Sequence, residues 1–184
     1  MLICVDLDGT LFDTVSVNAA SYQAALNELG YTLTVDYFAA HCNGRHYKEF
    51  LPALMGGSPD SADLERVHDR KKALYRSYLP SARRNEALFA LLDRLRDRCD
   101  LAVVTTGSRQ NALEILDAFG CRDWFGLVVT SEDVTRSKPD PEGYRKAMAH
   151  FGADAAHTVI FEDSPTGLAA ARASGAAVFQ VDKF

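Results

Sequence analysis

The sequence predicts an α/β fold in which a doubly wound parallel sheet carries an all-helical insertion after its first strand. Short apolar, β-prone runs alternate with amphipathic helical patterns over most of the chain, as in βαβ units. Between residues 15 and 80 the alternation stops and only helical patterns remain. We therefore expect a core domain formed by residues 1–14 and 81–184, and a separate helical domain formed by residues 15–80.

Five apolar runs have the length and composition of buried strands. The first begins at residue 2 and runs directly into an acid, Asp6. Because these runs are apolar throughout instead of alternating with polar residues, we expect helices on both faces of a parallel sheet. The predicted strands are residues 2–5, 101–105, 127–130, 158–161 and 177–181.

Helices are predicted where apolar residues recur at spacings of three and four. In the core, Leu88, Leu92 and Leu95 mark one such stripe. The predicted core helices are residues 83–98, 108–119 and 141–151, and the predicted helices of the insertion are residues 18–29, 35–41, 47–55 and 62–78.

Composition limits the classes of partner. The formal net charge is −5, and Lys and Arg form no block, which argues against nucleic acid or an anionic membrane surface as partner. No apolar stretch approaches the ~20 residues of a membrane span, and no signal-peptide pattern is visible, so we expect a cytoplasmic protein. We also expect either a monomer or a weak homodimer. The scattered cysteines are expected to be reduced: Cys4, Cys42, Cys99 and Cys121.

Polar side chains follow the first four predicted strands. The same residue types occur in ordinary turns and helix caps, and Asp6 with Asp8 alone fits a turn. Glu162 and Asp163 exceed what capping needs, because Ser164 already stands where the next helix should begin. In chain order the polar residues at the strand ends are Asp6 and Asp8, Thr105 and Thr106, Lys138, and Glu162 and Asp163.

Four carboxylates in one crevice repel one another unless a cation lies among them. Oxygen-only ligands favour Mg²⁺, and a nearby lysine and threonine hydroxyl would complete a site that positions a phosphoryl group. Ligands of open parallel sheets bind at the carboxyl ends of the strands. For the acids to meet there, the first strand must lie between the second and fourth, which predicts the order third, second, first, fourth, fifth.

Four segments resemble, in order and at compatible spacing, the motifs of the haloacid dehalogenase-like (HAD) hydrolase superfamily. The resemblance covers nearly the whole chain and implies a Rossmann-like core. The helical insertion resembles the cap of the subgroup that contains phosphoglycolate phosphatases and β-phosphoglucomutases. The matching segments are DLDGTLFDT at residues 6–14, VVTTGS at 103–108, SKPDP at 137–141 and IFEDSPTGLAAARASG at 160–175.

The resemblance implies a role for each matching residue. Asp6 would be the nucleophile that forms an aspartyl-phosphate, and Asp8 the general acid and base. Thr105 would bind a phosphoryl oxygen, and Lys138 would stabilise both Asp6 and the phosphoryl group. Mg²⁺ would be held by Asp6, the backbone carbonyl of Asp8 and Asp163, with Glu162 in support.

Two further residues are expected to contact substrate. Thr106 follows Thr105 in the second motif, and Arg45 in the insertion aligns loosely with a phosphate-binding arginine of sugar-phosphate members of the family. A solvated turn arginine is an equally good interpretation of Arg45. Dehalogenases have a different residue where Asp8 stands, so halide chemistry is not expected.

The function expected from these motifs is Mg²⁺-dependent hydrolysis of a small phosphorylated metabolite. A sugar-phosphate mutase would use the same site, but mutases carry a histidine twelve residues after the nucleophile, where this chain has Asn18. A receiver-type signalling domain also gathers acids, a threonine and a lysine, but it carries its phosphorylated aspartate later in the chain and lacks the insertion. A catalytically idle binding protein would need a broken motif, and all four are intact.

Overall fold

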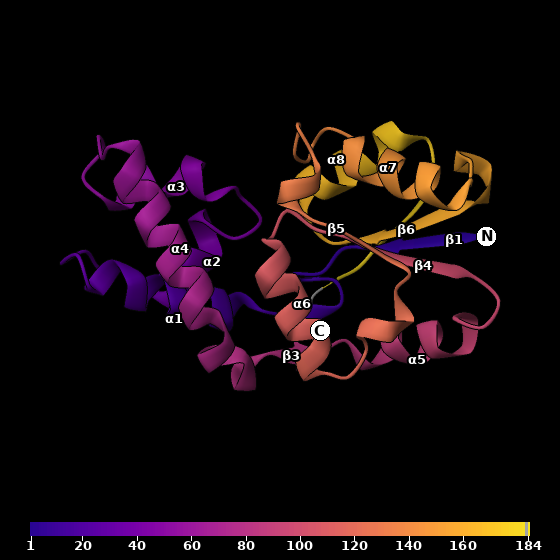
Figure 1. The fold of residues 1–184 in the computed structure, drawn as a ribbon, viewed down its shortest axis with the longest axis horizontal. Coiled ribbons are helices and arrows are strands. Elements are labelled where there is room, and N and C mark those ends of the chain that lie inside the picture. Colours follow the sequence, from indigo (N-terminus) through magenta and orange to yellow (C-terminus); the bar gives the residue numbers. More distant parts are fainter. Residues whose placement is uncertain (183) are drawn as a thin grey trace. The chain divides into compact units, whose positions relative to one another are not determined.

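The computed structural model describes residues 1–182 and residue 184. The chain divides into two compact units, drawn in Figure 1, which we describe separately. The core unit is Met1–Asp13 together with Arg83–Phe184, and the helical unit is Thr14–Ala82.

The core unit is built on a five-stranded parallel sheet. Its strand order is β5-β4-β1-β6-β7, which confirms the predicted order. The first strand lies at the centre, with Cys4 paired to Ala102 on one side and to Ile160 on the other. The strands are β1 (Leu2–Val5), β4 (Asp100–Val104), β5 (Leu127–Val129), β6 (Thr158–Glu162) and β7 (Ala177–Gln180).

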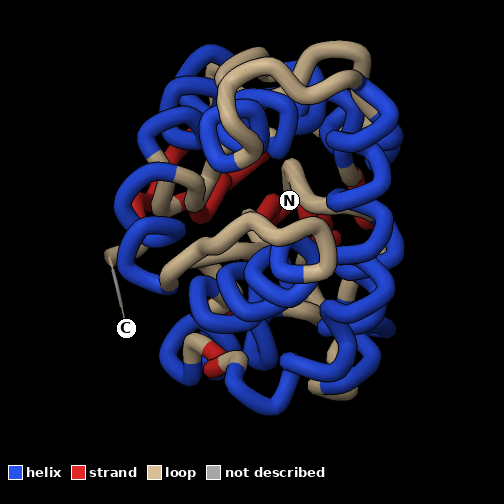
Figure 2. Tube along the Cα trace, turned by 90° about the vertical axis from the view of Figure 1, so that its left-hand side faces the viewer, coloured by secondary structure: helices blue, strands red, loops and turns tan. Residues whose placement is uncertain are grey.

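Helices cover both faces of this sheet, as Figures 1 and 2 show. On one face lie α7 (Glu142–Phe151) and α8 (Pro165–Ser174), and on the other α5 (Glu86–Leu95) and α6 (Arg109–Ala118). Burying the apolar runs of the strands between these layers supplies the main stabilisation of the core. Short 3₁₀ turns, Arg122–Trp124, Ser131–Asp133 and Ala155–His157, connect the elements.

The predicted helix 83–98 begins later than expected. Residues Arg83–Arg84 form a short strand, β3, which pairs antiparallel with β2 (Phe12–Asp13). The side chain of Asn85 then caps α5 by accepting a hydrogen bond from the backbone N–H of Leu88 at 3.1 Å. The helix therefore starts at Glu86, because an asparagine in this position favours a helix start over a helix interior.

The helical unit contains α1 (Val15–Asn27), α2 (Val35–His41), α3 (Tyr47–Leu54), α4 (Ser61–Tyr78) and a 3₁₀ turn (Leu79–Ser81). These bounds agree with the predicted helices to within a few residues. The helices enclose their own apolar core, in which α1 and α4 pack together. Its centre includes Leu26, Phe38, Phe50, Leu51 and Val67.

Two further features concern the cysteines and the lengths of the helices. Cys4, Cys42, Cys99 and Cys121 are all free thiols. Within the described residues, no helix is both long and apolar enough to cross a membrane.

One half-buried histidine, His68, makes the stability of the helical unit sensitive to acid. His68 stacks on Tyr47 with ring centroids 3.8 Å apart, and its Nδ1 lies 3.0 Å from the Tyr22 hydroxyl. Burial, assisted by the charges of Lys71 and Lys72, lowers the pKa of His68 to about 4. The folded state therefore keeps this ring neutral at pH values where the unfolded chain protonates it.

We expect the free energy of unfolding to fall as the pH drops from about 6.5 towards 4, because the folded-state pKa of His68 lies below its ordinary value of 6.5. The full loss is on the order of 3 kcal/mol at about 1.4 kcal/mol per pKa unit. Urea unfolding at a series of pH values measures it. A His68→Phe variant, which keeps a ring but cannot titrate, should lose this component, and an equally steep pH dependence in that variant would contradict the assignment.

Candidate active site

The loop after β1 places two acids at the carboxyl end of the central strand. Asp6 is almost fully buried, and its backbone N–H donates to the carbonyl of Phe161 in the neighbouring strand at 3.0 Å. The chain then turns tightly, and the backbone N–H of Phe12 donates a hydrogen bond to the carbonyl of Leu7 at 3.0 Å. This turn carries Asp8, whose side chain is half-buried.

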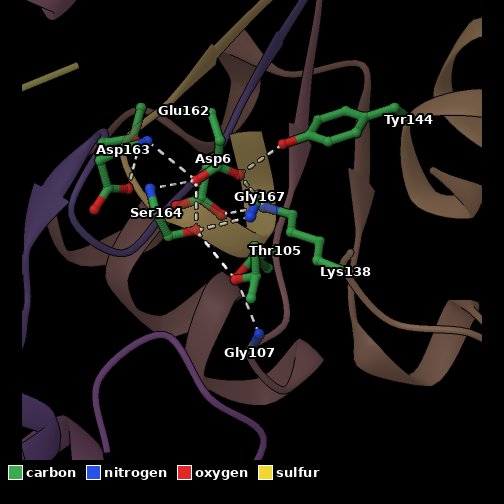
Figure 3. Close-up of polar contacts among 11 residues, drawn as sticks. Asp6, Thr105, Gly107, Lys138, Tyr144, Glu162, Asp163, Ser164 and Gly167 are labelled. Carbon is green, nitrogen blue, oxygen red and sulfur yellow. Dashed lines mark hydrogen bonds and ion pairs between the residues drawn. The ribbon is translucent and has the colours of Figure 1, made fainter. Parts of the chain in front are cut away.

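Thr105 follows β4 and lies beside Asp8. Its hydroxyl accepts a hydrogen bond from the backbone N–H of Gly107 at 3.0 Å (Figure 3). A Cβ atom added to Gly107 would lie 3.3 Å from the Thr105 Oγ1 and 3.6 Å from the Asp8 Oδ2. The hydroxyl and the second carboxylate therefore converge on one small space, with Thr106 half-buried next in the chain.

Lys138 joins Asp6 to a third acid. Its Nζ lies 2.6 Å from Asp6 Oδ1 and 2.6 Å from Glu162 Oε2, and only 7% of its side chain is exposed (Figure 3). The loop that carries Lys138 is fixed by Glu142, whose carboxylate accepts from the backbone N–H groups of Thr135 and Arg136 at 3.0 and 2.9 Å. Glu142 therefore fixes the backbone of the loop that carries Lys138, and the two acids fix its ammonium.

Glu162 is fully buried, and protein donors occupy both of its oxygens. Oε1 accepts from the backbone N–H groups of Asp163 and Ser164 and from the Ser164 hydroxyl, at 3.0 to 3.1 Å. Oε2 accepts from Lys138 and from the Tyr144 hydroxyl, the latter at 2.8 Å. Because its oxygens are already engaged, Glu162 is better suited to orient Lys138 than to bind a metal directly; its predicted supporting role at the metal stays a prediction.

Asp163 lies against the turn that follows β1. Its Oδ1 accepts a hydrogen bond from the Thr10 hydroxyl at 2.8 Å. Gly9 has φ +94°, and a Cβ atom there would lie 2.2 Å from Asp163 Oδ2. Glycine is therefore required at position 9 both by the backbone conformation and by the approach of this carboxylate.

The charges at the strand ends do not balance within the protein. Carboxylate oxygens of Asp6, Glu162 and Asp163 lie within 4.8 Å of one another, and Lys138 is the ammonium paired with two of them. Burial and the charge of Glu162 raise the pKa of Asp6 well above its usual range. Burial, with a further contribution from Glu162, raises that of Asp163 to about 6.

The pKa of Lys138 shows that its charge is kept. Burial alone would lower this pKa, but the negative charges of Asp6 and Glu162 outweigh burial and raise it well above its usual value. A single ammonium still leaves an excess of negative charge around Asp6 and Asp163. This donor set of closely spaced carboxylate oxygens fits a hard divalent cation such as Mg²⁺.

Arg45, the remaining predicted contact residue, belongs to the helical unit. Its Nε lies 3.4 Å from Glu49 Oε2, and its terminal nitrogen donates to the carbonyl of His41 at 3.1 Å. Both contacts are exposed, as expected for a surface arginine. Its contact with substrate stays a prediction.

Comparison with known proteins identifies the family. The model of the haloacid dehalogenase-like hydrolases matches residues 3–181, almost the entire chain. The chain belongs to this family. It is accordingly an enzyme of the hydrolase class, which confirms the family and the enzyme type expected from the four motifs.

Several known proteins are similar to this chain over most of their own length. Validoxylamine A 7'-phosphate phosphatase from Streptomyces hygroscopicus subsp. limoneus is 30% identical over 177 residues, covering 92% of this chain and 80% of that protein. Phosphoglycolate phosphatase from Neisseria meningitidis is 31% identical over 181 residues, covering 94% and 76%. The crystal structure of CbbY from Rhodobacter sphaeroides in complex with phosphate shares the fold, with a TM-score of 0.89 at 24% identity, covering 100% and 86%.

Three residues of this hydrolase site were not singled out from the sequence as site residues. Tyr144 and Glu142 both lie in the predicted helix 141–151, and neither belongs to one of the four matching segments. Gly167 lies in the first turn of α8, where a Cβ atom would come within 1.9 Å of Glu162 Oε2. Gly167 is the one of the three for which the sequence offered a signal: it falls just after the helix start expected at Ser164, and a glycine inside a helix often has a packing reason.

We expect Gly167→Ala to lower activity at least tenfold, because the added methyl group displaces Glu162, and Glu162 is the carboxylate that pairs with Lys138. Tenfold corresponds to about 1.4 kcal/mol of transition-state stabilisation. Phosphate release from an active ester measures the effect, with circular dichroism as the test of folding. Ala169→Ser, at an exposed position two residues further along α8, is the control and should retain activity. Wild-type activity in Gly167→Ala would contradict the role given to this close approach.

Proposed function

We propose that this hydrolase is a Mg²⁺-dependent phosphatase that cleaves a small phosphate monoester through an aspartyl-phosphate on Asp6. The observation that carries the proposal is the contact between the buried Asp6 carboxylate and the Lys138 ammonium at 2.6 Å, at the carboxyl end of the central strand. Similarity to proteins named as phosphatases supports the same reaction class.

The reaction would proceed in two displacements. A carboxylate oxygen of Asp6 attacks phosphorus, the bond from phosphorus to the leaving alcohol breaks, and Asp8 donates its proton to the leaving oxygen. Water then attacks the aspartyl-phosphate, Asp8 takes the proton of that water, and the bond from phosphorus to Asp6 breaks to release inorganic phosphate. Two displacements replace one direct attack by water on a negatively charged ester.

The other core residues would stabilise the charge on the transferring group. Lys138 is placed to interact with a phosphoryl oxygen as well as with Asp6, and Thr105 and Thr106 follow the adjacent strand. Asp6, Asp163 and the backbone carbonyl of Asp8 would hold Mg²⁺. When bound, the ion would supply positive charge to the phosphoryl oxygens, the principal means of accelerating phosphoryl transfer.

The helical unit would act as a cap that selects the substrate. In this proposal residues 15–80 form the cap domain, residues 1–14 and 81–184 form the catalytic core, and Arg45 contacts the substrate. Two of the relatives are named as phosphatases of phosphoglycolate and of validoxylamine A 7'-phosphate. The proposed substrate class is therefore a small phosphorylated metabolite.

A panel of phosphate esters, assayed for free phosphate with Mg²⁺ present, tests the proposal. Release of phosphate from at least one small monoester supports it. The absence of release from every ester at an enzyme concentration near that of substrate would refute it.

We expect the protein to release phosphate from β-glucose 1-phosphate rather than to isomerise it. Asn18 stands where the mutases carry a histidine, and an amide neither titrates nor becomes positively charged. Incubation with β-glucose 1-phosphate and a trace of the bisphosphate, followed by assays of glucose 6-phosphate and free phosphate, measures the partition. Glucose 6-phosphate formed much faster than free phosphate would favour the mutase.

A further inference from the structure

Tyr144 of α7 donates to the carboxylate that anchors Lys138. Its side chain is 1% exposed, and its hydroxyl lies 2.8 Å from Glu162 Oε2 (Figure 3). The Lys138 Nζ lies 5.3 Å from the centroid of the same tyrosine ring. The tyrosine therefore contacts the lysine with its ring and the partner of the lysine with its hydroxyl.

Two donors share one oxygen of Glu162. The Lys138 ammonium and the Tyr144 hydroxyl both donate to Oε2, while Oε1 receives donors from Asp163 and Ser164. A carboxylate oxygen that accepts a second hydrogen bond has less negative charge to offer the first donor. The Tyr144 hydroxyl thus weakens the attraction of Glu162 for Lys138.

Lys138 is held between two acids at equal distance. Its Nζ lies 2.6 Å from Asp6 Oδ1 and 2.6 Å from Glu162 Oε2. In a buried site water contributes little screening, so the ammonium moves towards whichever acid offers it more negative charge. Without the tyrosine hydroxyl, Lys138 would be drawn towards Glu162 and away from Asp6.

We propose that Tyr144 is a positioning residue, which acts through Glu162 to keep the Lys138 ammonium at Asp6. This inference rests on the proposed function, in which Asp6 is the nucleophile and Lys138 stabilises the transferring phosphoryl group. A phenylalanine would fill the same space in the core between α7 and the sheet. The hydroxyl is therefore the part of the side chain that serves the reaction.

The test is the Tyr144→Phe variant of the full chain, assayed with p-nitrophenyl phosphate and Mg²⁺. We expect kcat to fall about tenfold while KM changes less than threefold, because the displaced ammonium affects the reacting group more than the binding of the ester. Tenfold corresponds to about 1.4 kcal/mol. Met148→Ala is the matched control, since Met148 is a buried residue of the same helix, and its kcat should stay within twofold of wild type.

A double-mutant cycle identifies the route of the effect. In a Glu162→Gln background, Tyr144→Phe should change kcat less than twofold, because the group through which the hydroxyl acts has lost its charge. The proposal is overturned if Tyr144→Phe keeps kcat within twofold of wild type, if its loss is equal in both backgrounds, or if Met148→Ala lowers kcat as much. A wild-type protein inactive towards every ester would overturn the proposed function itself, which distinguishes the two failures.

Discussion

Replacing Asp6 by asparagine is expected to reduce phosphate release by at least a thousandfold and to leave the fold intact. Asparagine has nearly the shape of aspartate, and its amide oxygen can still accept a hydrogen bond from Lys138. It lacks the charge needed to attack phosphorus and to bind a divalent cation. A thousandfold loss corresponds to about 4 kcal/mol of transition-state stabilisation, a reasonable figure for removal of a nucleophile.

The comparison should be made with Asp13→Asn. Asp13 belongs to the same stretch of sequence, but it lies in β2 and forms a surface ion pair with Arg83 at 2.6 Å. This control should retain activity, since exposed ion pairs contribute little to stability. Circular dichroism and thermal unfolding would establish that both variants fold. More than a few per cent of wild-type turnover in folded Asp6→Asn would exclude Asp6 as the nucleophile.

Position at the strand ends explains why the central residues of this site could be found from sequence. Asp6, Thr105 and Glu162 each end or directly follow a buried strand, and parallel strands bring their carboxyl ends to one edge of the sheet. The strand order followed from the requirement that the acids meet. Lys138 lies in the loop after the third strand of the chain order, so the same rule drew attention to it, and the resemblance to a family motif then gave it a role.

The partners of these residues depend on packing that leaves no local pattern. The Tyr144 hydroxyl meets Glu162 because α7 packs on the sheet at one particular rotation, which the spacing of apolar residues does not specify. Glu142 bonds backbone groups six and seven residues earlier in the chain, a contact that depends on the shape of the intervening loop.

The two-residue ribbon of β2 and β3 was also missed, for a different reason. A strand of two residues is too short to show alternation, and Arg83 and Arg84 were absorbed into the following helical stripe. Asn85 carried a usable signal, since an asparagine before an apolar helical run favours the N-cap position.

Removal of divalent cations is expected to abolish activity, and Mg²⁺ should restore it more effectively than Ca²⁺. The oxygens of Asp6 and Asp163 lie within 4.8 Å of each other, in a site whose negative charge exceeds what Lys138 balances. Mg²⁺ favours a compact octahedral arrangement of oxygens, whereas Ca²⁺ accepts looser and higher coordination that positions a phosphoryl group less well. The measurement is phosphate release after treatment with EDTA and dialysis, followed by titration with each ion. Full activity in excess EDTA would remove the metal from the mechanism.

Asp163→Asn provides the residue-level form of the same experiment. The amide oxygen can still accept the hydrogen bond from Thr10, so the loop should keep its position, but the neutral side chain binds a cation more weakly. We expect the Mg²⁺ concentration for half-maximal activity to rise at least tenfold, which corresponds to about 1.4 kcal/mol of binding free energy. Asp154→Asn, at an exposed acid that pairs with His157, should leave this concentration unchanged. An unchanged Mg²⁺ requirement in Asp163→Asn would show that the cation is held elsewhere. A direct ligand that loses its charge lowers the affinity of the site for the ion.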